Sequence, residues 1–324
     1  MSLRRYNEVL FLLAIILLLM IGFLGPKFWK IPQPLFNFKS IQNNFSNPVE
    51  SIDRSNQFYS NNNYLSSDQF NDKNVVFKWS SIILNYVKKD VPIPRMYFPY
   101  IPKNISQFKI NEKKSVFLAI LLPIALRGNE LVLEERKLMK IAFSKNNIYQ
   151  IERFSKKYKV KNFKKINFSN LNRLELKILR LELLNKINSI PISLILAQSI
   201  IESGWGGSRF AQEGNALFGQ WTWKNNDGIK PKENIDANFS VKNFKNLQES
   251  VNSYILNLNS HPAYKELRNF RESQYNDGKN FTGNDMANFL EKYAEIGFEY
   301  ITKVKNMIKK NQLSKYENST LATF

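Results

Sequence analysis

The sequence predicts a mainly α-helical fold that carries a small β-hairpin and is preceded by an N-terminal transmembrane helix. Three observations lead to this prediction. Apolar residues recur at helical spacings beyond residue 102, a turn-rich stretch interrupts them between residues 221 and 244, and the first thirty residues contain a long uncharged run. With 324 residues, 43% of them hydrophobic, the chain is long enough to bury a sizeable core.

The first thirty residues predict a membrane anchor. Arg4 and Arg5 precede an uncharged run over residues 9–25, and Lys27 follows it. At ~1.5 Å per residue, this run just reaches across the apolar core of a bilayer. A cleaved signal peptide is the alternative, although residues 20–22 and 23–25 fit a small-x-small cleavage site poorly. Because both arginines precede the run, we expect a single-pass protein of the bacterial inner membrane, with the rest of the chain in the periplasm.

Composition narrows the functional classes. The 47 Lys+Arg against 27 Asp+Glu give a formal net charge of +20, which favours nucleic acid, anionic lipid or an acidic wall polymer as surroundings. An exported chain rarely meets DNA, so no nucleic-acid partner is expected. Cysteine is absent and His261 is the single histidine, which disfavours thiolate sites, histidine metal sites and a Ser-His-Asp triad. We interpret His261 as a loop residue and expect no metal or other cofactor.

Changes in composition divide the chain. Residues 31–90 are expected to be a flexible linker, because they are rich in Asn, Ser and Gln with little sustained periodicity. Prolines at 92, 94, 99 and 102 forbid a regular helix and mark an extended lead-in. We therefore expect a folded domain over residues 91–310 and a C-terminal tail over 311–324, after the anchor or signal at 1–30.

Apolar periodicity predicts helices at 115–125, 130–143, 171–187, 192–203, 247–258 and 286–293. Two of them show a clear apolar face, formed by Leu171, Leu174, Ile178 and Leu181 in one and by Leu247, Val251, Tyr254, Ile255 and Leu258 in the other. We expect both faces to be buried. Thr282 and Asp285 form a plausible capping pair before the last helix. Between 221 and 244, the turn sequence Asn225-Asn226-Asp227-Gly228 and the alternation of Phe239, Val241 and Phe244 predict the β-hairpin.

The helix at 192–203 has an acid close to its end. Pro191 suits its first turn, and three glycines at 204, 206 and 207 stop it directly after Glu202. An acid beside an apolar helix face and Trp205 is partly desolvated, which raises a carboxyl pKa and suits a general acid. The alternative is that Glu202 only hydrogen-bonds backbone groups of the turn.

Two linked strings extend this motif, LAQSIIESGWGGSRF at 196–210 and EGNALFGQW at 213–221. Together with LLPIALRGNE at 121–130 and NLNSHPAY at 257–264, they resemble the bacterial glucosaminidases of glycoside hydrolase family 73, and among them the Bax-type proteins. The resemblance covers roughly residues 90 to 308. It implies a lysozyme-like helical fold with a small β-lobe, and an endo-β-N-acetylglucosaminidase that cleaves the GlcNAc-β-1,4-MurNAc bond of peptidoglycan strands.

The resemblance also implies roles for single residues. Glu202 matches the catalytic acid and Tyr293 matches a tyrosine that lines the cleft. For substrate binding we expect aromatic walls, which exclude water next to sugar C–H surfaces, together with neighbouring motif residues: Trp205, Phe218, Trp221, Tyr264 and Asn215. Trp221 and Trp223 have packing of the β-lobe as an equal alternative.

A second carboxylate is harder to assign. Many glycosidases need one as base or nucleophile, whereas some use the acetamido group of the substrate. The candidates are Glu213, Asp227, Glu233 and Asp236, and we choose Glu233 as the second catalytic residue.

Two other functions stay open. A lysozyme-like muramidase or lytic transglycosylase shares the fold and the helix-end acid, but the outer matching strings argue against it. A non-catalytic wall-binding protein has no chemical reason to keep an intact Glu-Ser-Gly-Trp-Gly string.

Overall fold

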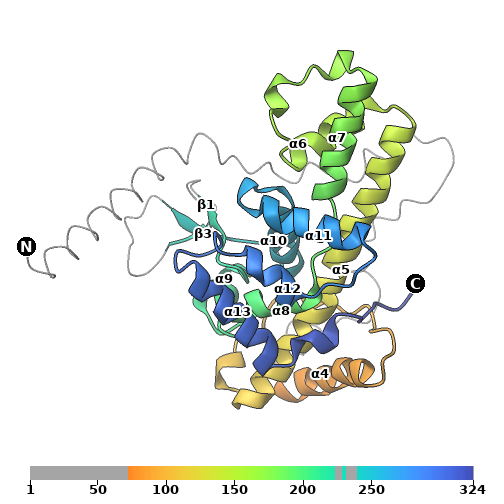
Figure 1. Cartoon of the computed structure of the whole chain (residues 1–324). Coiled ribbons are helices and arrows are strands. Elements are labelled where there is room, and N and C mark those ends of the chain that lie inside the picture. Colours follow the sequence, from red (N-terminus) through yellow and green to blue (C-terminus); the bar gives the residue numbers. More distant parts are fainter. Residues whose placement is uncertain (1–71, 223–227, 231–238, 324) are drawn as a thin grey trace, which may run out of the picture. The chain divides into compact units, whose positions relative to one another are not determined.

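The computed structural model describes residues 72–222, 228–230 and 239–323 (Figure 1). This part of the chain is mainly helical, as predicted. The N-terminal apolar run, Trp223 and the segment with Glu233 lie outside the described residues. The α-helices are α4 (Lys73–Lys88), α5 (Ile110–Ser144), α6 (Ile148–Lys157), α7 (Arg173–Lys186), α8 (Ile192–Ser203), α9 (Arg209–Gly214), α10 (Leu247–Ser260), α11 (Lys265–Asn276), α12 (Gly283–Met286) and α13 (Phe298–Lys310).

Helix α5 forms the centre of the core. The sequence predicted two helices here, but one helix of 35 residues continues through Pro123 and through the polar stretch after it. Every residue from 116 to 128 is buried, with α4, α8 and α10 packed around the helix. Gly128 permits the close approach of α10, since a Cβ atom there would lie 2.8 Å from Ile255. Among the described helices, α5 alone is long and apolar enough to cross a membrane, yet most of it is buried inside the fold, as in a core helix.

Helix α4 corrects the predicted linker. Residues 73–88 were expected to be flexible, but they form a helix that packs against α5. Its buried face consists of Val76, Ser80 and Ile83, spaced by three and four residues, and Asp72 caps the first turn. Only three residues make this face, so the polar residues around them obscured the periodicity.

The predicted C-terminal tail is also wrong, because residues 311–323 belong to the folded unit. Leu313 and Tyr316 are buried in a 3-10 turn (Leu313–Tyr316). Further on, Leu321 pairs with Ile93 of the lead-in as a parallel bridge. The amide of Ile93 donates to the carbonyl of Thr320, and the amide of Ala322 donates to the carbonyl of Ile93, both at 2.8 Å.

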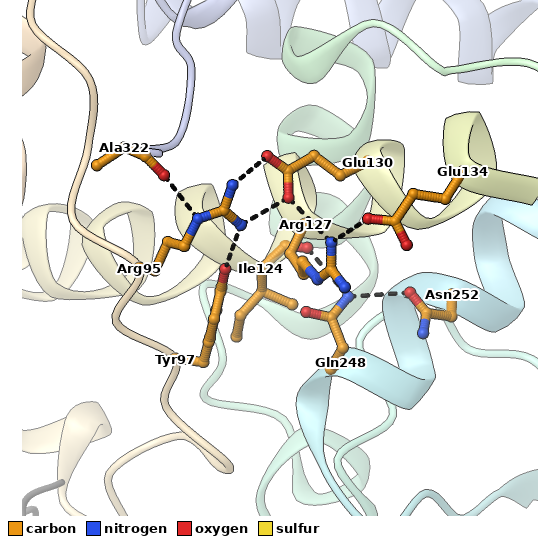
Figure 2. A network of polar contacts seen from close by, with 9 residues as sticks. All are labelled: Arg95, Tyr97, Ile124, Arg127, Glu130, Glu134, Gln248, Asn252 and Ala322. Atoms are coloured by element: carbon orange, nitrogen blue, oxygen red, sulfur yellow. Dashed lines mark hydrogen bonds and ion pairs between the residues drawn. The ribbon is translucent and has the colours of Figure 1, made fainter. Parts of the chain in front are cut away.

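An ionic network connects the lead-in segment and the C-terminal segment to α5 (Figure 2). Arg95 donates to both carboxylate oxygens of Glu130, at 2.7 and 2.8 Å, and its Nε donates to the carbonyl of Ala322 at 2.6 Å. Arg127, which is buried, donates to Glu130 at 3.1 Å and to Glu134 at 2.9 Å. A buried guanidinium needs carboxylate partners. This explains why the charged residues 127–134 can lie inside a core helix.

Helix α7 is present as predicted, but with the opposite face buried. Leu179 and Leu183 point into the fold, whereas Leu174, Ile178 and Leu181 are exposed. The sequence contains two apolar faces on this helix, and spacing alone could not say which one the neighbouring helices cover.

Three short strands form one antiparallel sheet. They are β1 (Trp221–Thr222), β2 (Gly228–Ile229) and β3 (Ser240–Lys242), in the order β1-β3-β2. Trp221 pairs with Val241, and Gly228 pairs with Lys242. A small apolar cluster of Ala216, Val241 and Phe244, with Phe210 against it, supports the sheet.

The remaining helices bring distant residues to the end of α8. The predicted apolar face of α10 is confirmed, since all five of its residues are buried. Thr282 and Asp285 form the predicted capping box on α12. The helix expected over 286–293 is wrong beyond Phe289, because α12 passes into a 3-10 turn (Ala287–Phe289) and the chain then turns back. This turn allows Tyr293 to stack on Tyr300 of α13, with ring centroids 5.1 Å apart.

Candidate active site

The turn after α8 fixes the position of Glu202. Helix α8 ends at Ser203, and the next three residues, Gly204, Trp205 and Gly206, all have left-handed φ angles of 58°, 60° and 74°. Ser203 is fully buried, and its hydroxyl donates to the carbonyl of Ser199 at 2.6 Å and accepts from the amide of Gly206 at 2.9 Å. Such bonds hold the turn in a backbone conformation that L-residues rarely adopt.

Glycine is required at position 206 for a second reason. A Cβ atom there would lie 2.9 Å from the ring of Phe117 and 3.0 Å from Ile101. The turn therefore lies directly on the central helix α5, which keeps the end of α8 in place.

The carboxyl group of Glu202 is largely desolvated. Burial raises its pKa, while a hydrogen bond from Tyr300 and the positive charge of Lys303 lower it by smaller amounts. The hydroxyl of Tyr300 donates to Oε1 of Glu202 at 2.6 Å. The other oxygen, Oε2, faces Gly219, where a Cβ atom would lie 3.6 Å away. Because desolvation dominates, Glu202 keeps its proton at a higher pH than an exposed glutamate does.

A chain of three hydrogen bonds ends at Glu202. The hydroxyl of Tyr254 donates to Oε1 of Gln198 at 2.6 Å, and Nε2 of Gln198 donates to the hydroxyl oxygen of Tyr300 at 3.0 Å. Tyr300 then donates to Glu202. All donors point the same way, so each bond polarises the next. Gln198 is fully buried one helical turn before Glu202, and this network fixes which oxygen of Glu202 accepts a hydrogen bond.

Aromatic rings surround this chain. Phe218 stacks on Tyr254 with centroids 4.0 Å apart, and Tyr293 stacks on Tyr300. The hydroxyl of Tyr293 donates to the carbonyl of Phe218 at 3.4 Å. Burial raises the pKa of Tyr254, Tyr293 and Tyr300 well above that of free tyrosine. These phenols therefore stay neutral and act as hydrogen-bond donors.

The structure brings together some of the predicted residues. Glu202 and Tyr293 both contact Tyr300. Phe218 and Tyr264 lie in the same cluster, but they are only 3% and 5% exposed. Such buried rings offer little surface to a glycan, and the expectation that they bind substrate stays a prediction. They form the layer behind Tyr293, which Tyr264 contacts at 6.2 Å between ring centroids.

Other predicted residues make contacts elsewhere. Trp205 packs edge-on against Phe117, and the ammonium of Lys114 lies over its ring. Trp221 is 46% exposed and stacks on Phe239, at 4.5 Å between centroids. This exposed face remains suited to a sugar ring, so its role stays a prediction.

Two predicted polar residues remain without support at the site. The amide of Asn215 donates to the carbonyl of Phe244 at 3.0 Å, which fixes the loop to the segment after β3. Glu233 lies outside the described residues, so its role as second acid stays a prediction. Among the described charged groups, Lys303 shifts the pKa of Glu202 and no carboxylate does. Glu213 is paired instead with Arg209 at 3.3 Å.

His261 serves the local backbone, as expected for a loop residue. It lies between α10 and the next 3-10 turn (Pro262–Tyr264), where its Nδ1 accepts from the amide of Ala263 at 3.2 Å. Burial and the nearby charges of Lys159, Arg268 and Lys186 lower its pKa to about 4, so it is neutral at physiological pH. Within residues 72–222, 228–230 and 239–323, no cluster of His, Cys, Asp and Glu suits a metal ion.

Comparisons with known proteins show which family the chain is similar to. Residues 180–313 match the glucosaminidase family, described as mannosyl-glycoprotein endo-beta-N-acetylglucosaminidase. Protein bax of Escherichia coli K12 is 28% identical over 208 residues, which cover 62% of this chain and 70% of that protein. Over these regions the chain is similar to the glucosaminidase family and to protein bax. No solved structure matches significantly. The resemblance seen in the sequence is thus confirmed, and the family match points to a hydrolase of the glycosidase type.

The matched region of this glucosaminidase-like protein contains the whole hydrogen-bond chain, from Gln198 to Tyr300. Sequence reasoning missed the roles of Gln198, Tyr254 and Tyr300. Gln198 had a signal, because a polar residue four positions before Glu202 shares its helix face. Tyr254 was placed in the core, and Tyr300 is brought to Glu202 only by the docking of α13 on α8.

Proposed function

We propose that this protein is an endo-β-N-acetylglucosaminidase that cleaves the GlcNAc-β-1,4-MurNAc bond of peptidoglycan, with Glu202 as the proton donor. The observation that carries the proposal is the desolvated carboxyl of Glu202, whose pKa is raised by burial at the end of α8. A general acid must be protonated at the working pH and must release its proton as the bond breaks. The family match supports a glycan substrate.

The two oxygens of Glu202 have different tasks in this proposal. Oε1 accepts the hydrogen bond from Tyr300, so Oε2 holds the transferable proton on the side of Gly219. As the glycosidic oxygen takes that proton, negative charge develops on the carboxylate. Tyr300 stabilises this charge, because a hydrogen bond to a carboxylate is stronger than one to the neutral acid. Tyr300 is therefore a positioning residue.

The second half of the reaction requires a base or a nucleophile. Either Glu233 or the acetamido group of the substrate supplies it. A large loss of activity in Glu233→Gln supports two carboxylates, and a small loss supports substrate assistance.

A comparison of two acids tests the role of Glu202. Glu202→Gln keeps the shape of the side chain but removes the transferable proton, so clearance of purified sacculi should slow by at least ~10²–10⁴. Glu213→Gln is the matched control, since Glu213 is exposed and paired with Arg209, and it should lose less than about tenfold. If Glu202→Gln stays within about tenfold of the parent while circular dichroism shows an intact fold, Glu202 is not the proton donor.

We further propose that residues 9–25 anchor the protein in the inner membrane with the catalytic domain in the periplasm. The support is the length of this uncharged run and the two arginines before it. Cell fractionation should recover the protein in the inner-membrane pellet. A soluble form that begins beyond Gly25 would instead mean a cleaved signal peptide.

A further inference from the structure

Helix α7 carries an exposed apolar stripe. Leu174, Ile178 and Leu181 are 65%, 55% and 53% exposed, and their spacing of four and three residues puts them on one face of the helix. The opposite face is already buried, through Leu179 and Leu183. Large aliphatic side chains grouped on a folded surface mark an interaction site more often than isolated ones do. This stripe is therefore a candidate surface for binding another apolar surface.

The order of aliphatic residues suits one kind of partner. Leu174, Ile178 and Leu181 correspond to positions d, a and d of a heptad repeat. Isoleucine at position a and leucine at position d favour a parallel coiled coil of two helices, because the β-branched isoleucine packs well at the a layer.

The charges beside the stripe suit the same arrangement. Lys177 lies along one edge, at heptad position g, and Glu175 and Glu182 lie along the other edge, at position e. In a parallel pair, position g of one helix meets position e of the next heptad in the other helix. Lys177 then meets Glu182 of a second copy. An antiparallel pair would bring equal charges together.

Contacts within the chain leave both charged edges of the stripe available for pairing. Oε1 of Glu182 accepts from the amide of Lys161 at 2.8 Å and lies 3.5 Å from Nζ of Lys186, yet the side chain is still 27% exposed. Lys177 on the opposite edge is exposed. These bonds hold the glutamate side chain at the edge of the stripe, so little conformational freedom is lost when a second copy pairs with it.

We propose that α7 is a self-association surface, which pairs in parallel with α7 of a second copy about a two-fold axis along the helix. The helix is 14 residues long, or two heptads, so the pair is smaller than a standard stable interface and the dimer is weak in free solution. If the chain is anchored in a membrane, as proposed above, confinement to one surface raises the effective concentration of the partner.

Site-directed cross-linking tests the geometry, because the chain has no cysteine. In the parallel pair, two copies of residue 178 face each other across the axis, within reach of a disulfide. Full-length Ile178→Cys in detergent should form a disulfide dimer on oxidation. Ile110→Cys is the control, since Ile110 is 61% exposed at the far end of α5, and it should stay monomeric. A mixture of Leu174→Cys and Ile178→Cys chains that joins 174 to 178 in preference to 178 to 178 would mean antiparallel pairing and overturn the proposal.

Sedimentation measures the equilibrium. Ile178→Asp should raise the dimer dissociation constant at least about tenfold, since two aliphatic side chains leave the interface, with an unchanged circular dichroism spectrum. Lys177→Glu should raise it roughly two- to tenfold, and the double variant Lys177→Glu with Glu182→Lys should restore it, because the charges are exchanged. A parent protein that stays monomeric at all concentrations refutes self-pairing. Protection from maleimide of the thiol introduced by Ile178→Cys in that monomer would show that another segment of the same chain covers the stripe.

Discussion

Replacing Tyr300 by Phe tests the hydrogen-bond chain that ends at the candidate acid. The change removes one oxygen, which donates to Glu202 at 2.6 Å and accepts from Nε2 of Gln198 at 3.0 Å. Gln198 is fully buried, so its amide loses its acceptor without gaining water. An unsatisfied buried donor costs about 1–3 kcal/mol. For a domain of ~150–250 residues, that corresponds to a melting temperature lower by roughly 2–12 °C.

The same variant should change the pH profile in a defined direction. Tyr300 donates to Glu202 and thereby lowers the pKa of its carboxyl. Without this hydroxyl the pKa rises, and more of the protein holds the proton at a given pH. The alkaline limb of kcat/KM, which reports the acid of the free enzyme, should therefore move to higher pH.

Tyr254→Phe is the matched control for Tyr300→Phe. It removes the donor to Oε1 of Gln198, and so it should cost a similar amount of stability. It leaves the bond between Tyr300 and Glu202 in place, so the alkaline limb should move much less than in Tyr300→Phe. Turbidity rates of sacculi between pH 5 and 9, with calorimetry on each variant, provide both readouts. Equal displacement of the limb in both variants, or a shift to lower pH in Tyr300→Phe, would refute the assigned role of this hydroxyl.

Three further predictions concern stability. Burial of ionised Glu202 destabilises the fold; this destabilisation is absent below the ordinary pKa of glutamate and present above the raised pKa of Glu202. Glu202→Gln should therefore raise the melting temperature at pH 8 and not at pH 3.5. A gain at low pH alone would contradict desolvation as the cause. Gly204→Ala should lower the free energy of unfolding by ~1 kcal/mol, the cost of a left-handed residue, because nothing lies within 4 Å of its Cβ position. Gly206→Ala should lower it by about 1–3 kcal/mol more, because its Cβ would overlap its neighbours. Equal denaturant midpoints for the two variants would argue against the close contact. Glu130→Gln should lower the free energy of unfolding by about 1–3 kcal/mol, because two guanidinium groups lose their shared anion; a change under about 0.5 kcal/mol in urea unfolding would show that the network contributes little.

Most of the helical core follows from local sequence patterns. Helix α8 has the predicted bounds, and the five apolar residues of α10 are all buried. Such elements are predictable because one dominant apolar face decides both the helix and its orientation. Helix α7 has two such faces, and the choice between them depends on neighbours that are distant in the sequence. The buried pairing of Arg127 with Glu130 likewise hid the continuity of α5, since charged residues mid-helix usually indicate a boundary or a surface.

The candidate site was predictable at its centre and less so around it. Glu202 is marked by the apolar helix before it and the glycines after it, which are both local features. The hydrogen-bond chain behind Glu202 uses Tyr254 from α10 and Tyr300 from α13, and Tyr300 lies 98 residues away in the sequence. Aromatic residues in the matching strings were expected to touch substrate, yet Phe218 and Tyr264 are buried behind Tyr293. Sequence gives residue type but does not tell the front layer of a wall from the layer that supports it.

The sugar at the new chain end tests the proposed activity most directly. Purified sacculi are digested with the full-length protein, reduced with borohydride and analysed by mass spectrometry. Cleavage on the reducing side of N-acetylglucosamine predicts fragments that end in reduced N-acetylglucosamine, and Glu202→Gln should produce none above background. Fragments that end in reduced or anhydro N-acetylmuramic acid would contradict the proposal and indicate a muramidase or a lytic transglycosylase.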